Sequence, residues 1–338
     1  MDSEWKNPGF GRHYTSAIDG RSLGRIPMLD LDSALAAVKF ARSEANTWAR
    51  VDLDERRRRV SDCLAGLKQH RELIALLLMW EIGKPYAQAL TDIDRCVSGV
   101  EWYVENIAGM LAGRAPLGLI SNIASWNYPM SVLMHAVLVQ VLAGNSSISK
   151  TPTDGGLYSL TLAHALARRA ALPVSLVSGS GGQLSEALVR NEFVDCLAFV
   201  GGKTNGGVIT STLYDEKKRY LLEMEGVNTY GVWQFSNWPL LPSSSAKASI
   251  TASSAAPPMS VSSCSASYSR NSSRCTCPSF AHFASAIPCL SNLLPIHFRG
   301  STSVRSSTAK KWRNCAFFMS MRLAKVPSAF MKRAFPRA

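Results

Sequence analysis

Residues 117–129 read LGLISNIASWNYP, a short apolar run followed by a polar turn that precedes a helical stretch. The same alternation of short apolar runs and helical stretches continues to residue 224. The expected strands are Leu117–Asn122, Ser146–Lys150, Val174–Val177, Cys196–Val200 and Arg219–Met224, and the expected helices are Ser131–Leu142, Gly156–Arg169, Leu184–Val189 and Gly206–Tyr214. Strands that alternate with helices predict an α/β fold with a mostly parallel, Rossmann-like sheet covered on both faces. Ligands of such open sheets bind beyond the carboxyl ends of the strands.

Helices are predicted before this segment, over residues 31–112. Asp30 or Asp32 can cap the first of them, because apolar residues follow at helical spacing. Residues 73–80 are apolar on most sides, which predicts a buried helix. The Gly-Lys-Pro of residues 83–85 is expected to end that helix.

The composition changes abruptly near residue 242. Residues 1–242 hold 24 Lys and Arg against 24 Asp and Glu, whereas residues 243–338 hold 13 Lys and Arg, 23 Ser and no acidic residue. A folded soluble protein normally mixes both charge signs, and this tail also lacks periodic apolar patterning. We therefore expect the tail to be largely disordered. Its Cys275 and Cys277 form an isolated C-x-C, so no metal site is expected.

Composition also bears on partners and location. The pI near 9.5 would suggest nucleic acid, but the basic residues of the tail are scattered, so no nucleic-acid partner is expected. The apolar stretches Leu73–Trp80 and Val132–Ala143 are too short or too interrupted to span a bilayer, so no membrane association is expected. Cys63, Cys96 and Cys196 are widely spaced, which suits a reduced cytoplasm.

The turn at residues 125–129, SWNYP, follows the first expected strand. An asparagine at this place can aim its amide N–H at an oxyanion that develops during a reaction. Asn and Pro are also common turn residues with no chemical role. The residues alone leave both readings of Asn127 open.

Three further motifs close expected strands. KTPT at residues 150–153 offers a lysine that can bind ribose or phosphate, or can be a solvated strand end. FVGGKTNGG at residues 199–207 is a glycine-rich turn into a helix, where the backbone can approach a phosphate, although the spacing is not GxGxxG. LEMEG at residues 222–226 carries a carboxylate that can act as a general base or be a surface charge.

Taken in order, these four motifs resemble those of the NAD(P)-dependent aldehyde dehydrogenase superfamily. That family carries a WN-[YF]-P turn, a K-P-x-[ES] strand end, an F-[TV]-G-S-x-x-x-G turn and an L-E-L-G-G strand end. The resemblance extends over about residues 20–240 and includes EIGKP at residues 81–85. It implies an oxidoreductase that oxidises an aldehyde to a carboxylic acid with NAD or NADP through a cysteine thioester. It further implies a helical segment at residues 1–115 that packs on an NAD(P)-binding domain at residues 116–240.

The resemblance also implies roles for individual residues. Asn127 is implied to hold the oxyanion, and Glu223 to activate the water that cleaves the thioester. The residues implied to line the nucleotide site are Trp126, Lys150, Thr153, Gly201, Gly202 and Gly206. Thr153 stands where many NAD-preferring members have Glu, which leaves room for the 2′-phosphate of NADP. Glu225 and Val227 depart from the usual Gly and Lys beside that glutamate.

The family's nucleophile is missing from its expected place. A cysteine in a G-Q-x-C context should follow the glutamate by roughly 34 residues. Residues 246–261 read AKASITASSAAPPMSV, with no cysteine, and Cys264 has only serines around it. Nothing in that setting would lower the pKa of a thiol.

A shifted reading frame supplies the missing motif. When the third base of each codon from Ala246 onward is joined to the next two bases, allowed codon choices spell KGFDYGKQRCTAYVR. Its cysteine codon straddles Ala255 and Ala256, which lie 32 and 33 positions after Glu223. The same offset over residues 301–315 allows DFGPLINGKEVEEL, which resembles the family's F-G-P-[LV]-I stretch.

The hypothesis from sequence is therefore a frameshift between about residues 238 and 241. Residues 241–338 would then be an out-of-frame basic, Ser-rich tail in place of the catalytic domain, and the chain as written would be inactive. The alternative is a nucleotide-binding pseudoenzyme or remnant without turnover. For an intact enzyme we expect a small aldehyde substrate and a homo-oligomer.

Overall fold

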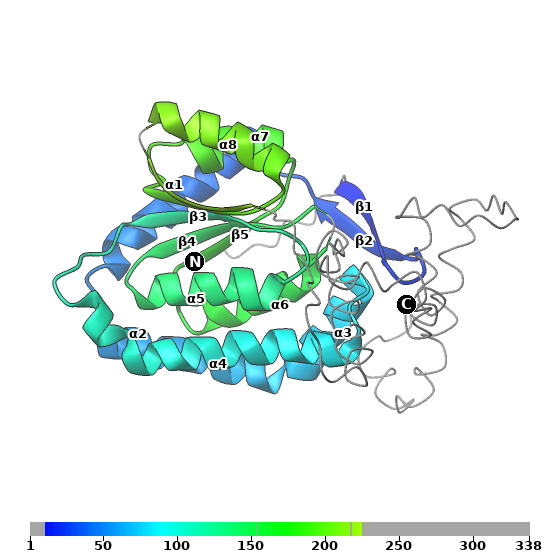
Figure 1. The fold of residues 1–338 in the computed structure, drawn as a ribbon, viewed down its shortest axis with the longest axis horizontal. Coiled ribbons are helices and arrows are strands. Elements are labelled where there is room, and N and C mark those ends of the chain that lie inside the picture. Colours follow the sequence, from blue (N-terminus) through cyan, green and yellow to red (C-terminus); the bar gives the residue numbers. More distant parts are fainter. Residues whose placement is uncertain (1–10, 154, 217, 225–338) are drawn as a thin grey trace, which may run out of the picture. The chain divides into compact units, whose positions relative to one another are not determined.

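The computed structural model describes residues 11–153, 155–216 and 218–224. Their centre is a five-stranded parallel sheet in the order β5-β4-β3-β6-β7 (Figure 1). The strands are β3 (Leu119–Ile123), β4 (Ser146–Lys150), β5 (Val174–Val177), β6 (Cys196–Gly201) and β7 (Arg219–Met224). This confirms the predicted α/β fold with a parallel sheet.

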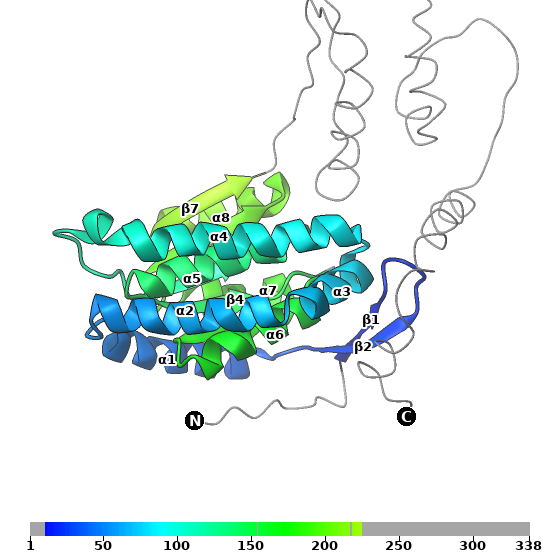
Figure 2. The same cartoon turned by 90° about the horizontal axis from the view of Figure 1, so that it is seen from below.

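Helices cover both faces of the sheet in layers (Figures 1 and 2). On one face lie α1 (Leu31–Trp48), α7 (Gly181–Ser185), the π-helical turn η2 (Glu186–Arg190) and α8 (Lys203–Glu216). On the other lie the π-helical turn η1 (Pro129–Met134), α5 (His135–Leu142) and α6 (Leu157–Arg169). An outer layer of α2 (Leu53–Gln69), α3 (Arg71–Ile82) and α4 (Tyr86–Leu111) packs over α5 and α6.

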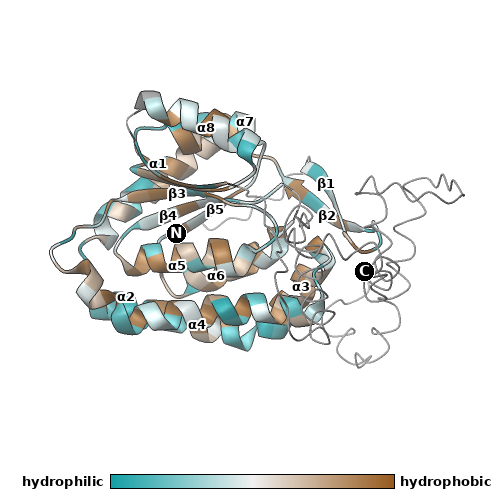
Figure 3. Cartoon of the chain, in the orientation of Figure 1, coloured by the Kyte–Doolittle hydropathy of each residue, from teal (hydrophilic) through white to brown (hydrophobic). Residues whose placement is uncertain are grey.

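The core has a larger and a smaller part. The larger cluster lies among α2–α6 and contains the fully buried Leu67, Leu78 and Leu138. The smaller cluster lies between α1 and the sheet and contains Val38 and Ile148. In Figure 3 the outer helices α2 and α4 carry hydrophilic stretches between hydrophobic ones, as expected of helices that bury one side only.

The ends of the first helices follow from single residues. Asp30, one of the two predicted caps, accepts a hydrogen bond from the Ser33 N–H at 2.8 Å. Asp52 caps α2 in the same way. Gly83 ends α3 with φ of 69°, a left-handed conformation that favours glycine.

An antiparallel hairpin, β1 (Gly11–Thr15) and β2 (Ser22–Pro27), precedes the helices and was not anticipated from sequence. Tyr14 and Ile26 on its inner side pack against Leu157 at the start of α6. The Tyr158 hydroxyl also donates to the Leu23 carbonyl at 2.5 Å. The hairpin therefore covers the beginning of α6.

Within the described ranges, no helix combines the length and apolarity needed to cross a bilayer. The same ranges contain no group of three or more His, Cys, Asp or Glu side chains placed to hold a metal ion. The predicted disorder of the tail and the reading of Cys275 and Cys277 concern residues outside those described.

Candidate functional site

The four motifs lie together at the carboxyl ends of the parallel strands. Parallel pairing places Ile123, the last residue of β3, beside both Lys150 of β4 and Phe199 of β6. It also places Gly201 beside Met224 of β7. From β3 the chain continues to β4 and then β5 on one side of that strand. It then crosses to the other side of β3, where it forms β6 and β7. The carboxyl ends of β3 and β6 therefore flank the point where strand order reverses, which is where open α/β sheets form their ligand crevice.

The turn after β3 is held by hydrogen bonds from two directions. The Ser125 hydroxyl donates to Oδ1 of Asn127 at 2.6 Å, and the Lys84 ammonium donates to the backbone carbonyl of Asn127 at 2.8 Å. In this arrangement the amide oxygen of Asn127 faces Ser125 and its NH₂ group faces away from it. Trp126, next to Asn127, is 36% exposed. The turn thus presents an amide donor and an indole from a fixed backbone.

Lys150 lies at the end of β4 and is buried, and its ammonium donates to the carbonyl of Thr151 at 2.9 Å. Thr153 is exposed, and its carbonyl accepts a hydrogen bond from the Arg12 guanidinium of the hairpin. The loop after β4 therefore offers a buried ammonium at its start and an exposed hydroxyl three residues later.

Gly201 at the end of β6 and Gly206 in α8 both lie close to neighbouring side chains. A Cβ on Gly201 would lie 2.7 Å from Cζ of Phe199, and one on Gly206 would lie 2.3 Å from Sδ of Met224. The Gly206 N–H donates to the Gly202 carbonyl at 3.0 Å and so belongs to the first turn of α8. Gly206 leaves room for the Met224 side chain between α8 and β7. Because α8 begins directly after β6, its N-terminal end lies at the carboxyl end of that strand, where the motifs meet.

Glu223 is exposed on β7, paired in register with Val200 of β6. Its neighbour Leu222 packs with Phe199 and Leu213 in the cluster beneath α8. Because side chains alternate along a strand, Glu223 points to the opposite face of the sheet from α8. Leu221, on that same opposite face, is 60% exposed.

Glu81 is a buried acid that sequence reasoning did not single out. Its carboxylate accepts hydrogen bonds from the backbone N–H groups of Tyr158 and Ser159 at 2.5 and 3.1 Å, and from the Ser159 hydroxyl at 2.8 Å. Burial raises the pKa of Glu81, and these bonds oppose that rise. Because Glu81 occupies the N-terminus of α6, the N-terminus of α8 is the better placed of the two to meet an anion.

A second glycine-rich turn was also missed. Residues 178–182, SGSGG, follow β5, and the last residue of that strand pairs with Lys150. The Ser178 hydroxyl donates to the Pro27 carbonyl at 2.6 Å, which ties this turn to the end of the hairpin. The sequence signal was the cluster of Gly and Ser directly after a strand.

The described cysteines do not provide a nucleophile at this edge. Burial raises the pKa of the Cys63 thiol to about 12, that of Cys96 well above its ordinary value, and that of Cys196 as well. Cys196 is the first residue of β6 and so lies at the amino end of the sheet, away from the motifs. Thiols with raised pKa values are poor nucleophiles at neutral pH. Ala255 and Ala256, where the shifted frame places a cysteine, lie outside the described residues.

Comparison with known proteins identifies one family and several enzymes that this chain resembles. The sequence profile of the Aldehyde dehydrogenase family matches residues 12–253. The succinate-semialdehyde dehydrogenase [NADP(+)] GabD of Escherichia coli is 26% identical over 245 residues, 67% of this chain and 51% of that protein. The NADP-dependent glyceraldehyde-3-phosphate dehydrogenase of Pisum sativum is 27% identical over 229 residues, 60% of this chain and 46% of that protein. This chain thus spans about half the length of the curated relatives it matches.

Solved structures share the fold. The crystal structure of an E. coli NADP-dependent enzyme has a TM-score of 0.67 at 24% identity, over 72% of this chain and 54% of that chain. The glyceraldehyde-3-phosphate dehydrogenase GapN of Methanocaldococcus jannaschii, complexed with NADP, has a TM-score of 0.58 at 20% identity. This match covers 67% of this chain and 54% of that chain. The family profile covers more than half of the chain. The chain therefore belongs to the aldehyde dehydrogenase family.

Proposed function

We propose that this chain is the nucleotide-binding half of an NAD(P)⁺-dependent aldehyde dehydrogenase, and that it lacks the cysteine needed for turnover. The observation that carries the proposal is the meeting of the Asn127 turn, Lys150 and the glycine turn at the switch point between β3 and β6, while the described thiols are buried or distant. In this proposal residues 116–240 form the nucleotide-binding domain, on which the preceding helical segment packs. Residues 241–338 stand in place of the catalytic domain.

The chemistry at the edge suits a dinucleotide. The ammonium of Lys150 and the N-terminal turn of α8 are positive groups that complement ribose and diphosphate oxygens. Trp126, Gly201, Gly202 and Gly206 complete the proposed nucleotide site. When bound, the nicotinamide of the cofactor supplies a hydride acceptor. The names of several relatives specify NADP, and Thr153 adds no carboxylate to oppose a 2′-phosphate.

Two residues of this chain are proposed to act on the substrate in an intact enzyme. The Asn127 amide N–H donates to the aldehyde oxygen as that oxygen gains negative charge after thiolate attack. Glu223 takes a proton from the water that cleaves the acyl–sulfur bond, which releases the carboxylic acid. Both steps require a cysteine thiolate, and allowed codon choices in the shifted frame place that cysteine across Ala255 and Ala256.

Nucleotide binding without turnover is the expected behaviour of the chain as written. Titration with NADP should quench tryptophan fluorescence, because Trp126 borders the proposed site. The variant Lys150→Met should weaken NADP binding about tenfold or more, since a charge-assisted hydrogen bond contributes about 1.5–3 kcal/mol. Lys39→Met, an exposed lysine on α1, is the matched control and should bind as the parent chain does. Equal affinities of the parent and the Lys150→Met variant would contradict the assignment.

The choice between the two dinucleotides is expected to depend on Thr153. In the variant Thr153→Glu, NADP affinity should fall about tenfold, because two negative groups at short range repel by roughly 1 kcal/mol or more. NAD affinity should stay constant or rise, since NAD has no 2′-phosphate and its ribose hydroxyls can donate to the new carboxylate. Calorimetric titrations of both nucleotides measure the ratio, with Thr153→Ser as the control. A parallel loss for both nucleotides would show that Thr153 does not face the 2′ position.

A further inference from the structure

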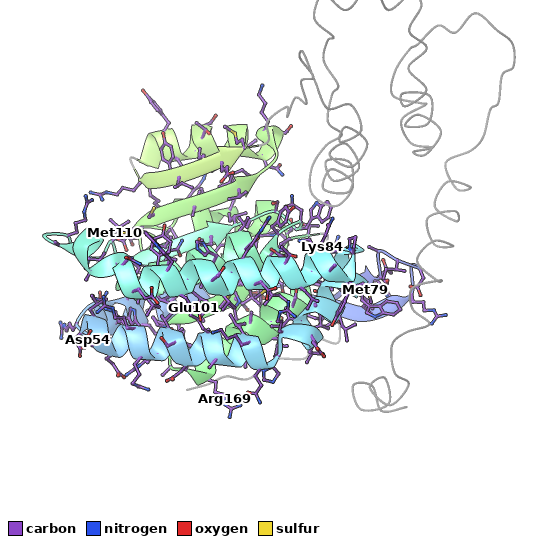
Figure 4. All side chains as sticks on the ribbon, turned by 60° about the horizontal axis from the view of Figure 1, so that its bottom comes forward. Asp54, Met79, Lys84, Glu101, Met110 and Arg169 are labelled. Carbon is purple, nitrogen blue, oxygen red and sulfur yellow. The ribbon has the colours of Figure 1, made fainter. Side chains whose placement is uncertain are left out.

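We propose that Lys84 is a positioning residue for the turn at residues 125–129: its buried ammonium, paired with Asp92, anchors the backbone of that turn to α3 and α4. The inference rests on the proposed function, because it gives Asn127 and Trp126 their places in the nucleotide and oxyanion site. It concerns a residue outside the four motifs, separated from Asn127 by 43 positions in the chain. Figure 4 labels Lys84 at the junction of α3 and α4.

The charged pair is completely enclosed. The Lys84 ammonium lies 3.0 Å from Oδ2 of Asp92, and both side chains are at most 1% exposed. Removing two charges from water costs several kcal/mol per ion, and such pairs seldom stabilise a fold beyond what apolar residues of similar size would give. A stabilising role alone therefore does not explain the pair. Fixing one arrangement of the groups around it is the better explanation.

The contacts of the pair converge on the turn and the helix that follows it. Lys84 donates to the Asn127 carbonyl at 2.8 Å, and its ammonium lies 3.9 Å from the centre of the Tyr128 ring, a cation–π contact. Asp92 accepts from the Ser131 N–H at 3.0 Å through Oδ1 and also from the Ser131 hydroxyl. The two charges thus hold the turn on both sides of Pro129.

The anchoring acts directly on Asn127. The backbone carbonyl of Asn127 is bonded to Lys84, and Oδ1 of the same residue is bonded to Ser125. With its backbone carbonyl and its side-chain amide both hydrogen-bonded, rotation of Asn127 is restricted. A donor that acts on an oxyanion must be held this closely, because small misplacement reduces its effect strongly.

Glu81 offers a natural comparison three residues earlier. It is also buried and charged, but its bonds go to the start of α6 and to Tyr14 rather than to the turn. The end of α3 and the residues that follow it therefore carry two buried ionisable side chains with separate hydrogen-bond partners. This separation allows the effect of Lys84 on the turn to be distinguished from a general loosening of the α3–α6 region.

The test uses the full chain and the double variant Lys84→Met, Asp92→Asn. This variant removes both charges, leaves no unpaired buried ion, and keeps an amide oxygen at position 92 to accept from Ser131. Amide hydrogen exchange measured by mass spectrometry should become at least tenfold faster over residues 125–132. Exchange in β3 and β4 should be unchanged, and the urea midpoint should stay close to that of the parent. Glu81→Gln, the matched control, should speed exchange at residues 157–160 and leave the turn as it is.

Unchanged exchange over residues 125–132 in the double variant would overturn the proposal. So would a uniform increase over the whole sheet, which would assign the pair to stability alone. Titration with NADP separates this inference from the proposed function. A weakening of at least fivefold in the double variant supports both, whereas a parent chain that binds no NADP refutes the proposed function and leaves the exchange result to decide the role of Lys84.

Discussion

Aldehyde oxidation is expected to be undetectable with the chain as written and to appear once a single base is added to its gene between codons 238 and 241. The insertion restores the frame in which allowed codon choices spell GKQRC, with a cysteine codon across Ala255 and Ala256. Loss of the nucleophile in a covalent enzyme typically lowers kcat on the order of a million-fold. The described thiols cannot replace it, because burial raises the pKa of each of them.

The measurement is NADPH or NADH formation at 340 nm with a panel of small aldehydes, for both chains at equal concentration. In the corrected chain, replacing the restored cysteine by serine should abolish the activity again, which controls for contaminating dehydrogenases. Asn127→Ala in the corrected chain should lower kcat by about a hundredfold to a thousandfold, the usual cost of one oxyanion donor. Turnover by the uncorrected chain would refute the proposed inactivity.

Acidification is expected to destabilise the folded domain between about pH 6.5 and 4, chiefly through His164. This side chain is buried on α6, and burial lowers its pKa to about 4. Nδ1 lies 2.9 Å from the Leu160 carbonyl and so carries the proton of the neutral ring. Nε2 has no hydrogen-bond partner within the part of the chain that the structure describes, so a second proton would be buried uncompensated.

The sign of this pH dependence of folding stability follows from the linkage between proton binding and folding. Above pH 6.5 the ring is neutral in both states and contributes no pH dependence. As the pH falls from 6.5 toward 4, the unfolded chain binds a proton that the folded chain does not, so stability falls with pH. The difference between 6.5 and about 4 corresponds to roughly 3 kcal/mol at the acid end. Burial lowers the pKa of His135 as well, which adds to the same trend.

Urea unfolding at a series of pH values, followed by circular dichroism, measures the effect. The variant His164→Leu removes the titrating ring and keeps an apolar side chain of similar size, so its stability should depend less on pH between 6.5 and 4. His13→Leu, at an exposed position of the hairpin, is the control and should keep the parent's pH dependence. Equal pH dependence in the parent and the His164→Leu variant would show that this ring is protonated without penalty.

Sequence reasoning predicted the sheet well because its signals were local. The bounds of β4, β5 and β7 agree with prediction, since each is a short segment that lies between helical stretches along the chain. The hairpin β1–β2 was missed because its strands are short and polar. Only Tyr14 and Ile26 are buried in it, and they are buried by residues of α6 more than 130 positions away. No local pattern reports a contact of that kind.

The candidate site shows the same division. Asn127, Lys150 and the glycines were predicted from sequence because each lies at or just after the end of an expected strand, and parallel pairing brings such ends together. Lys84, Glu81 and Asp92 were not assigned a role from sequence, because a charged residue near a helix end is normally solvated. Their burial results from the packing of α3 and α4 against η1 and α6.

The sequence by itself determined the alternation of strands and helices, the identity of the motif residues and the change of composition after residue 242. These are properties of residue type and spacing along the chain. Only the tertiary structure decided which buried charges hold the Asn127 turn, that Glu81 bonds the first turn of α6, and toward which face Glu223 points. The physical reason is that the free energy of a buried charge depends on partners distant in sequence, and only folding brings those partners within hydrogen-bonding distance.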